Sequence, residues 1–392
     1  MFKKKSRVVH SKKQNKNKIS RETLHFSGAS DRMLFGIVGI LTVFGVLMVA
    51  SAGIVYADVR FGDPYFFFKR QLIGVVLGLV LLVVFSRIDY HFFRKWAHVI
   101  YLSAITLLVL ILVPEFGITA YGASRWLNLG PIPSFQPSEM MKLALILYIA
   151  AWCSGKGAKV IEDFYTGLIP FLGIIGLPCV LVLMQPNVGT TSILVFIALA
   201  VFYLAGARSK HIFGVIGLGV AGIIILIIAA PYRMARFMSF INPEADPQGT
   251  GYQIQQALIA IGSGGWLGVG LGHSKQKGLY LPEPVGDSIF AIISEELGLI
   301  GALIVLIFFF LFAWRGMKIA ANAPDVFGKL VAGGITVWIT GQAIINIAAI
   351  TSLMPLTGIP MPFISYGGTS IIFSLAAVGI LLNISKQSKE KI

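Results

Sequence analysis

Residues 287–314 read DSIFAIISEELGLIGALIVLIFFFLFAW, an apolar run that opens on a carboxylate, Asp287. As a helix, the run is long enough to cross a hydrocarbon core of about 30 Å. Asp287 stands where an irregular segment rich in glycine and proline meets this run, and an ionisable group in that position is a candidate for function. Asp is also a preferred N-cap, so the sequence leaves two interpretations open: a functional carboxylate or a helix cap.

Apolar runs of comparable length recur along the chain. They lie at 31–57, 68–86, 96–114, 138–153, 167–184, 188–206, 211–230, 328–352 and 366–384. A composition of 56% hydrophobic and 12% charged residues excludes an ordinary soluble protein. The sequence therefore predicts an all-α polytopic membrane protein of about ten transmembrane helices, with a large extracytoplasmic loop between the seventh and the eighth. Gly74 and Gly78 form a GxxxG packing signal in the second helix.

The net charge of +15 could suggest nucleic acid as a partner, but its distribution indicates membrane topology instead. With the amino terminus inside, most of the 32 Lys and Arg residues fall on cytoplasmic segments. We therefore expect both termini on the cytoplasmic side of the membrane and no nucleic-acid partner. The expected parts are a disordered basic tail at 1–30 that contacts anionic membrane lipid, a transmembrane domain at 31–385 and a short tail at 386–392.

Metal-binding patterns are not evident in the sequence. Cys153 and Cys179 are isolated within apolar runs, and the six histidines are scattered. These spacings give neither a disulfide framework nor a protein-built metal site, so we expect no cofactor. A divalent cation carried by the substrate stays open.

Three segments on the outer side carry most of the unusual polar chemistry: 115–137, 231–287 and 353–366. We expect all three at the same face of the membrane. The first has loop-type sequence around Arg125 and Trp126. This pair could hold a phosphate and stack on a sugar or prenyl unit, although an interfacial Trp is also typical of a simple membrane anchor.

The second segment, 231–287, is too long for a tight turn and its sequence predicts an irregular functional loop. Its apolar patch at 257–261 is too short to span the membrane, which indicates an interfacial or re-entrant course. Its cations could place positive charge outside the membrane beside a pyrophosphate, or form a solvated rim. These cations are Arg233, Arg236, Lys275 and Lys277.

Further charged residues fall inside the apolar runs. Glu139 and Lys142 are three residues apart on one helix face, and neutralising each other is their plainest role. Glu295 and Glu296 do not share the helix face of Asp287, and we expect them to pair with a cation or with donors on neighbouring helices. In the third outer segment, Ser365 and the following Ser370 lie among prolines and glycines that could admit a lipid headgroup or simply pack the start of a helix.

Taken in order, these segments resemble the SEDS family (shape, elongation, division and sporulation), and within it the division branch, FtsW. The resemblance covers about residues 30 to 385. Its motifs are Gly122–Gly130, Gln136–Glu139, Gln185–Thr190, Gly249–Gly272, Leu281–Gly298 and Pro362–Ser370. The run at 268–277 is more similar to FtsW than to the elongation homologue RodA.

The resemblance implies a peptidoglycan glycosyltransferase that polymerises lipid II at the outer face of the plasma membrane during septal cell-wall synthesis. It makes Asp287, after the turn at Glu283, the essential residue. The family commonly has His-Thr before this Asp and Phe after it, whereas this chain has Val285-Gly286 and Ser288. The implied partners are lipid II, a class b penicillin-binding protein (a transpeptidase) and other membrane proteins of the division complex.

A single carboxylate suits this chemistry. A glycosidase needs one carboxyl group as an acid for a poor leaving group and a second carboxylate to activate water or to form a covalent intermediate. Undecaprenyl pyrophosphate can leave without protonation if cations hold it. We expect Asp287 to act as general base on the acceptor 4-hydroxyl. The candidate ligands of the pyrophosphates are Arg125, Lys142, Arg233, Lys275 and Lys277. A lipid II flippase, a RodA-like elongation polymerase and a noncatalytic scaffold stay open as alternatives.

Overall fold

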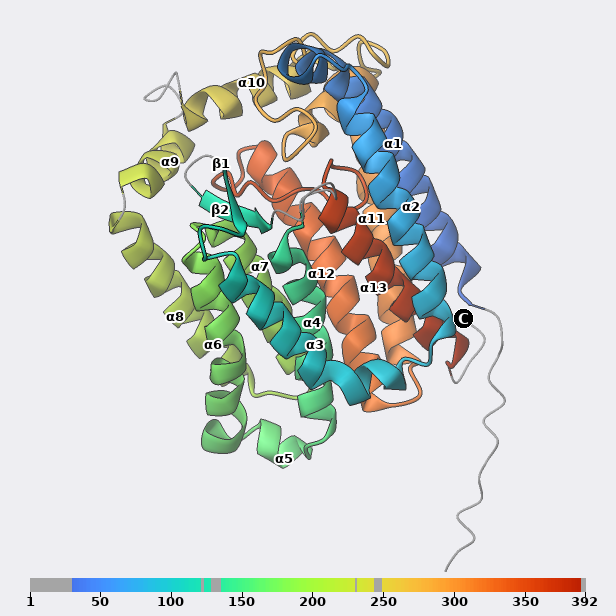
Figure 1. Ribbon diagram of the computed structural model, residues 1–392, viewed down its shortest axis with the longest axis vertical. Coiled ribbons are helices and arrows are strands. Elements are labelled where there is room, and N and C mark those ends of the chain that lie inside the picture. Colours follow the sequence, from blue (N-terminus) through green and yellow to red (C-terminus); the bar gives the residue numbers. More distant parts are fainter. Residues whose placement is uncertain (1–29, 121–122, 128–134, 230, 243–248, 389–392) are drawn as a thin grey trace, which may run out of the picture.

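The computed structural model describes residues 30–120, 123–127, 135–229, 231–242 and 249–388, and shows a bundle of long, tilted helices (Figure 1). Its long helices are α1 (Arg32–Phe61), α2 (Phe66–Arg87), α3 (His91–Leu110), α4 (Pro137–Ser154), α6 (Ile169–Leu183), α7 (Val188–Leu204), α8 (Ser209–Ile228), α11 (Ile289–Ala321), α12 (Val326–Ile350) and α13 (Gly368–Lys386). A short helix, α5 (Ala158–Ile161), and a π-helical turn, η1 (Phe164–Leu168), connect α4 to α6.

Each predicted apolar run overlaps one of these long helices, which confirms the all-α membrane architecture. Within the described residues, eight helices are long and apolar enough to cross a membrane: α1, α2, α3, η1 with α6, α8, α11, α12 and α13. The apolar helix α7 is shorter. The remaining predicted span is α4, whose first turns carry the buried Glu139 and Lys142. The protein is therefore a multi-pass membrane protein.

Close packing of α2 against α13 follows from the predicted GxxxG pair. A Cβ atom at Gly74 would lie 2.9 Å from the Ile371 side chain, and one at Gly78 would lie 2.6 Å from Leu375. The same Cβ atoms would lie 3.2 Å from the Gly368 backbone and 3.3 Å from Ile371 O, so the two glycines let the helix backbones pack closely. In contrast, α8 buries only Val215 and forms an edge of the bundle (Figure 1).

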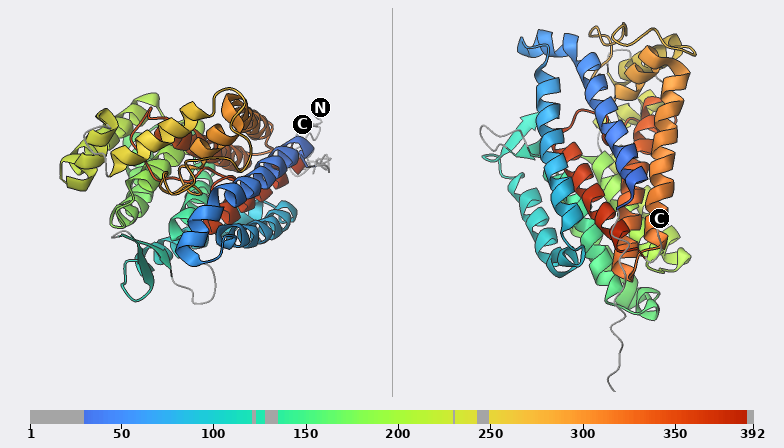
Figure 2. Two further views of the ribbon diagram at one scale, coloured as in Figure 1. Left: turned by 90° about the horizontal axis from the view of Figure 1, so that it is seen from above. Right: turned by 90° about the vertical axis from the view of Figure 1, so that its right-hand side faces the viewer.

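The second outer segment is more regular than the sequence indicates. It contains two helices, α9 (Pro231–Ile241) and α10 (Thr250–Ser263). The prediction of an irregular loop was wrong here, because Ile254, Ala257 and Ala260 recur at helical spacing and are buried on one face. Viewed from above, α10 crosses the end of the bundle (Figure 2).

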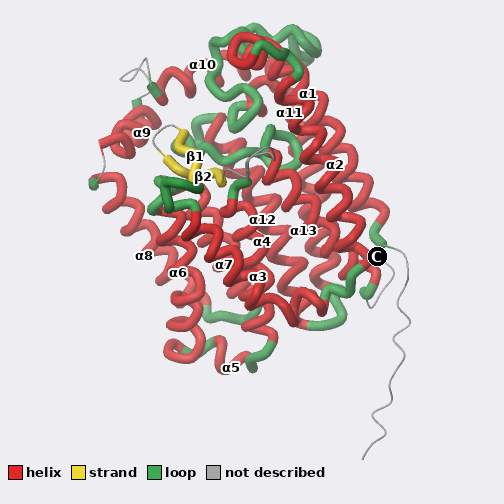
Figure 3. Tube along the Cα trace, in the orientation of Figure 1, coloured by secondary structure: helices red, strands yellow, loops and turns green. Residues whose placement is uncertain are grey.

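The first outer segment is a hairpin rather than a plain loop. Strands β1 (Gly117–Ala120) and β2 (Ala123–Leu127) pair antiparallel, with Trp126 opposite Ile118. Loops gather at the end of the bundle that carries this hairpin and α10, whereas α5 lies at the opposite end (Figure 3). The outer segments therefore share one end, as predicted.

The two ends of the described chain meet at the other end of the bundle. The backbone amide of Asp31 donates to Ser385 Oγ (3.1 Å), and Arg315 Nη2 lies 2.7 Å from Asp31 Oδ2. Both charged side chains are buried, at 9% and 0% exposed. This contact joins the start of α1 to the ends of α11 and α13.

Helix α11 is broken at Gly298, whose φ of 67° and ψ of −168° lie outside the helical range. The glycine-rich segment 264–270 fills the break. Val269 N and Gly270 N donate to the carbonyls of Glu295 and Glu296 (both 3.0 Å), and Leu299 N donates to Gly265 O (2.9 Å). Backbone groups freed inside a membrane helix must find partners within the protein, and this segment supplies them.

Candidate active site

Asp287 lies in a turn that precedes α11 rather than on the helix itself. Glu283 has a positive φ of 48°, and its carbonyl accepts from Gly286 N (3.0 Å) and Ser288 N (3.4 Å). Ser288 occupies the N-cap position of α11 and makes no side-chain capping bond. Asp287 therefore stands one residue before the N-cap position, in the turn that leads into α11.

Elements from three other parts of the chain surround Asp287. From α10, Gln253 Nε2 lies 3.4 Å from Asp287 Oδ1 and donates to Ser288 Oγ at 3.0 Å. From α12, Asn346 Nδ2 donates to the Asp287 backbone carbonyl at 2.9 Å. Gly358 approaches from the third outer segment, where a Cβ atom would lie 3.9 Å from Asp287 Oδ2. The Asp287 residue is half-buried.

The third outer segment is tied directly to the turn that holds Asp287. Tyr366 N donates to Val285 O at 2.8 Å. Ser365 is buried, and its hydroxyl accepts from Met361 N (2.8 Å) while its carbonyl accepts from Gln71 Nε2 (3.2 Å). Burial raises the pKa of the Tyr366 phenol, which keeps this hydroxyl neutral.

Arg125 and Trp126 lie on β2 and are both half-buried. The Arg125 guanidinium donates to the carbonyls of Gln185 (3.3 Å) and Pro186 (2.6 Å), at the junction before α7. These bonds fix the hairpin over the bundle. The pair predicted to meet a pyrophosphate is therefore positioned at the outer end, on an element separate from the Asp287 turn.

Glu139 and Lys142 form a buried ion pair of 2.8 Å, as the sequence predicts. Lys142 Nζ also donates to Gln342 Oε1 (2.8 Å), an oxygen that accepts from Trp338 Nε1 as well (2.8 Å). Glu139 Oε2 is buried without a hydrogen-bond partner among the described residues. The pair thus neutralises its own charge beneath the outer end while leaving one carboxylate oxygen unsatisfied.

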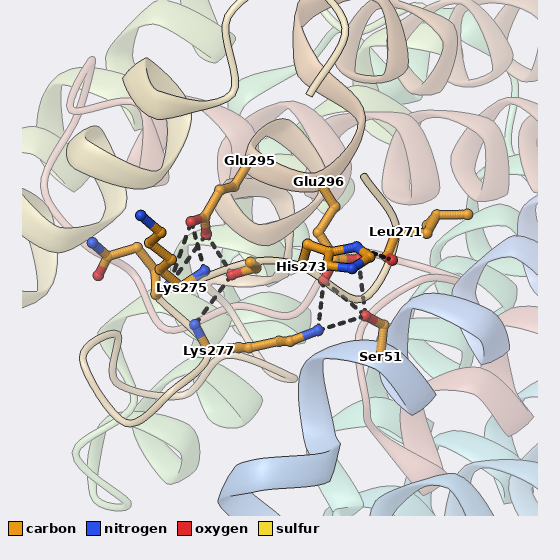
Figure 4. A network of polar contacts seen from close by, with 9 residues as sticks. Ser51, Leu271, His273, Lys275, Lys277, Glu295 and Glu296 are labelled. Atoms are coloured by element: carbon orange, nitrogen blue, oxygen red, sulfur yellow. Dashed lines mark hydrogen bonds and ion pairs between the residues drawn. The ribbon is translucent and has the colours of Figure 1, made fainter. Parts of the chain in front are cut away.

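Lys277 and Glu296 form a second buried ion pair of 2.8 Å, with exposed fractions of only 8% and 0% (Figure 4). Ser51 on α1 completes this cluster. Its hydroxyl lies 2.8 Å from both Glu296 carboxylate oxygens and 3.1 Å from Lys277 Nζ. The expectation that Glu296 pairs with a cation and a neighbouring helix is confirmed.

Glu295 points to the other side of α11 and binds the segment before the Asp287 turn (Figure 4). Its carboxylate accepts from the Ser274 hydroxyl and from Lys275 N (2.8 Å). The Lys275 side chain is exposed. Of the three lysines predicted for the pyrophosphates, Lys142 and Lys277 are buried and Lys275 is exposed.

The remaining predicted site residues are Arg233, Arg236 and Ser370. Arg233 on α9 is half-buried, and its Nη1 donates to Leu226 O on α8 (3.1 Å). Arg236 also lies on α9, but its side chain falls outside the described residues. Ser370 is buried in the first turn of α13. No group of three or more His, Cys, Asp and Glu side chains in the described part of the chain could hold a metal ion.

The family model described as "Cell cycle protein", which covers FtsW, RodA and SpoVE, matches residues 31–390. The chain belongs to the FtsW/RodA/SpoVE family. This membership confirms the resemblance drawn from the sequence motifs.

Several members of the FtsW/RodA/SpoVE family align over nearly their full length. Stage V sporulation protein E of Bacillus subtilis (strain 168) is 44% identical over 360 residues, or 92% of this chain and 98% of the relative. The probable peptidoglycan glycosyltransferase FtsW of Geobacter sp. (strain M18) is 39% identical over 359 residues, or 92% of this chain and 97% of the relative.

Solved structures of family members share the fold. A chain from a peptidoglycan synthase complex described as coordinating polymerization and crosslinking matches with a TM-score of 0.76 and 25% identity, over 93% of this chain and 99% of that chain. The crystal structure of RodA from Thermus thermophilus matches with a TM-score of 0.67 and 25% identity, with the same coverage.

Sequence reasoning missed three amide side chains that hold the third outer segment in place. Gln71, Gln342 and Asn346 are each 2% exposed or less and each bonds a backbone group of the third outer segment. Gln342 and Asn346 are amides within an apolar run, and that signal could have identified them, because a buried amide needs hydrogen-bond partners. Gln71 directly follows Lys69 and Arg70, which hides the same signal.

Proposed function

We propose that this protein is a peptidoglycan glycosyltransferase that polymerises lipid II at the outer face of the bacterial plasma membrane, in septal cell-wall synthesis. Family membership and relatives named as probable peptidoglycan glycosyltransferase FtsW support the reaction class. The observation that carries the proposal is the position of Asp287, a half-buried carboxylate in a turn where the second and third outer segments meet.

Asp287 is assigned as the general base. Its carboxylate takes the proton of the acceptor sugar 4-hydroxyl, and the resulting oxygen attacks the anomeric carbon of the donor. A carbon–oxygen bond forms as the bond to undecaprenyl pyrophosphate breaks, and the pyrophosphate leaves with the electron pair. This displacement inverts the anomeric carbon. The leaving group is already anionic, so no second carboxylate is required as an acid.

Cations stabilise the departing pyrophosphate in this proposal. Lys275 has an exposed side chain beside the Asp287 segment, and Arg125, Arg233 and Arg236 lie on elements of the outer end. Lys142 and Lys277 reach a pyrophosphate only if their buried ion pairs open. Trp126, Glu139, Glu283, Ser365 and Ser370 remain proposed contacts of the substrate, and a divalent cation carried by the pyrophosphate remains part of the hypothesis.

The partner is proposed to be a class b penicillin-binding protein that crosslinks the new strands. A related fold within a peptidoglycan synthase complex that coordinates polymerization and crosslinking supports this assignment. The distribution of Lys and Arg supports cytoplasmic termini, with the end that carries Asp287 facing outward.

The test compares the native chain with Asp287→Asn in the presence of the cognate crosslinking protein and lipid II, with glycan chain length as the readout. Glu115→Gln is the matched control, because it removes an exposed carboxylate between α3 and β1 without touching the Asp287 turn. We expect chains from the native protein and from the control, and none from Asp287→Asn at equal folded concentration.

Either of two results would overturn the proposal. Equal chains from Asp287→Asn would move the chemistry to another residue. Absence of chains from every variant, with partner and lipid shown to be competent, would favour the flippase or the scaffold, and a lipid II translocation assay in vesicles would then separate those two.

A further inference from the structure

Asn346 is an isolated amide in the apolar stretch of α12, and its side chain is 2% exposed. Both hydrogens of its amino group are used: Nδ2 donates to Asp287 O at 2.9 Å and to Ile359 O at 2.8 Å. The opposite orientation of the amide would place Oδ1 against two carbonyl oxygens, which repel it. One nitrogen atom therefore joins the Asp287 turn to the third outer segment.

This link acts on a non-helical turn, which the bond from Tyr366 N to Val285 O also ties to the third outer segment. Asp287 precedes α11, so the helix does not fix its backbone. Gly358, the neighbour of Ile359, has a φ of 65° and leaves open space beside the Asp287 carboxylate. Since Asn346 binds the backbone on both sides of this space, its position sets the separation between the carboxylate and the segment facing it.

A second amide of α12 strengthens the arrangement. One helical turn before Asn346, Gln342 Nε2 donates to Pro360 O at 2.8 Å. The two amides thus hold successive carbonyls, Ile359 and Pro360, along one face of α12. Gln342 also accepts from Lys142, so its removal would disturb the ion pair with Glu139, whereas Asn346 contacts no charged side chain through the bonds described here.

We propose that Asn346 is a positioning residue for Asp287, which holds the carboxylate at the distance from the third outer segment that the glycosyl transfer requires. This inference rests on the proposed function, because it takes Asp287 as the general base. Asn346 itself does not touch the reacting atoms. It acts through the backbone carbonyl of Asp287.

The matched control is Asn383 on α13, at the opposite end of the bundle. Asn383 is 4% exposed, accepts from Tyr90 N (3.0 Å) and donates to Ser86 O (3.1 Å). Its replacement by alanine removes a buried asparagine with a comparable set of backbone bonds. A purely structural role for Asn346 predicts that Asn346→Ala and Asn383→Ala behave alike.

The experiment measures lipid II polymerisation by the full chain with its crosslinking partner, together with the melting temperature of each variant. We expect both variants to melt at a similarly lowered temperature. Asn346→Ala should lower kcat by about 100-fold, the scale of a 1 Å misplacement of a catalytic group, with little change in KM. Asn383→Ala should keep its kcat near the native value per folded molecule.

Hydrogen exchange provides a readout independent of activity. Peptides covering 285–288 and 357–361 should exchange faster in Asn346→Ala and at the native rate in Asn383→Ala. If Asn346→Ala does not fold, Asn346→Asp keeps the side-chain volume and, in its neutral form, can donate only one of the two bonds. For Asn346→Asp we expect kcat to fall by about tenfold, less than the loss expected for Asn346→Ala.

Four results separate the possible failures. A native kcat in Asn346→Ala, or equal kcat losses in the two asparagine variants, would overturn the positioning role while leaving the proposed function intact if Asp287→Asn is inactive. A rise in KM alone would place Asn346 in substrate binding and also overturn the inference. Activity in Asp287→Asn would overturn the proposed function itself.

Discussion

Replacing Lys277 by methionine tests whether the cluster of Lys277, Glu296 and Ser51 stabilises the protein or serves the substrate. The Lys277 and Glu296 side chains are 8% and 0% exposed. Removing the ammonium leaves a fully buried carboxylate whose remaining bond in this cluster is to the Ser51 hydroxyl. Breaking a buried ion pair from one side costs about 3–5 kcal/mol, so we expect Lys277→Met to lower the stability by this amount.

The double variant Lys277→Met/Glu296→Gln should recover most of that loss, because no uncompensated charge remains and a glutamine can still bond Ser51. Lys69→Met is the matched control. It removes the lysine of an ion pair with Asp63 that has a similar distance, 2.9 Å, but side chains 62% and 36% exposed. Water screens this pair, and we expect only a small change in melting temperature.

The assay is unfolding in one detergent, by heat and by SDS titration, for the native chain, both single variants and the double variant. Equal stability of Lys277→Met and Lys69→Met would refute the reasoning, as would a double variant no more stable than Lys277→Met. Polymerisation by the double variant then reports on chemistry. An active double variant excludes Lys277 as an essential pyrophosphate ligand, and a stable but inactive one supports that role.

Two glycine substitutions test the backbone around the site. Gly268→Ala should lower the stability by about 1–3 kcal/mol more than Gly272→Ala. Both glycines have a positive φ, but only a Cβ at Gly268 would run into the backbone of Glu296. Equal melting temperatures of the two variants would contradict the docking of this segment into α11. Gly358→Ala and Gly62→Ala carry similar φ values, 65° and 68°, and should lose similar stability. Only Gly358→Ala should also slow polymerisation, measured per folded molecule, because its methyl group faces the Asp287 carboxylate.

The sequence was most informative where one physical requirement decides the structure. Long apolar runs must become helices in a membrane because their backbone groups need partners within the chain, and this requirement located the helices of the bundle. The Glu139–Lys142 pair was predictable for a similar reason, as the two charges lie on one helix face and each is costly alone.

Predictions were weaker where contacts join distant segments. Spacing indicated that Glu296 needs a cation, but not that Lys277 and Ser51 provide its partners, because these contacts cross between α1, α11 and a loop. The helical face of α10 was missed because short residues and glycines dilute its apolar pattern. Asn346 gave no periodic signal, and its importance follows from two carbonyls in separate segments.

The two charged clusters on α11 have a mechanical consequence. Arg315 joins Asp31 at the start of α1, and Glu296 joins Ser51 further along the same helix. Glu296 lies before the break in α11 at Gly298 and Arg315 lies after it, so both halves of α11 are attached to α1. Helices α1 and α11 therefore form a rigid frame, and movements that admit a long lipid chain should use the opposite side of the bundle, where α8 is least embedded.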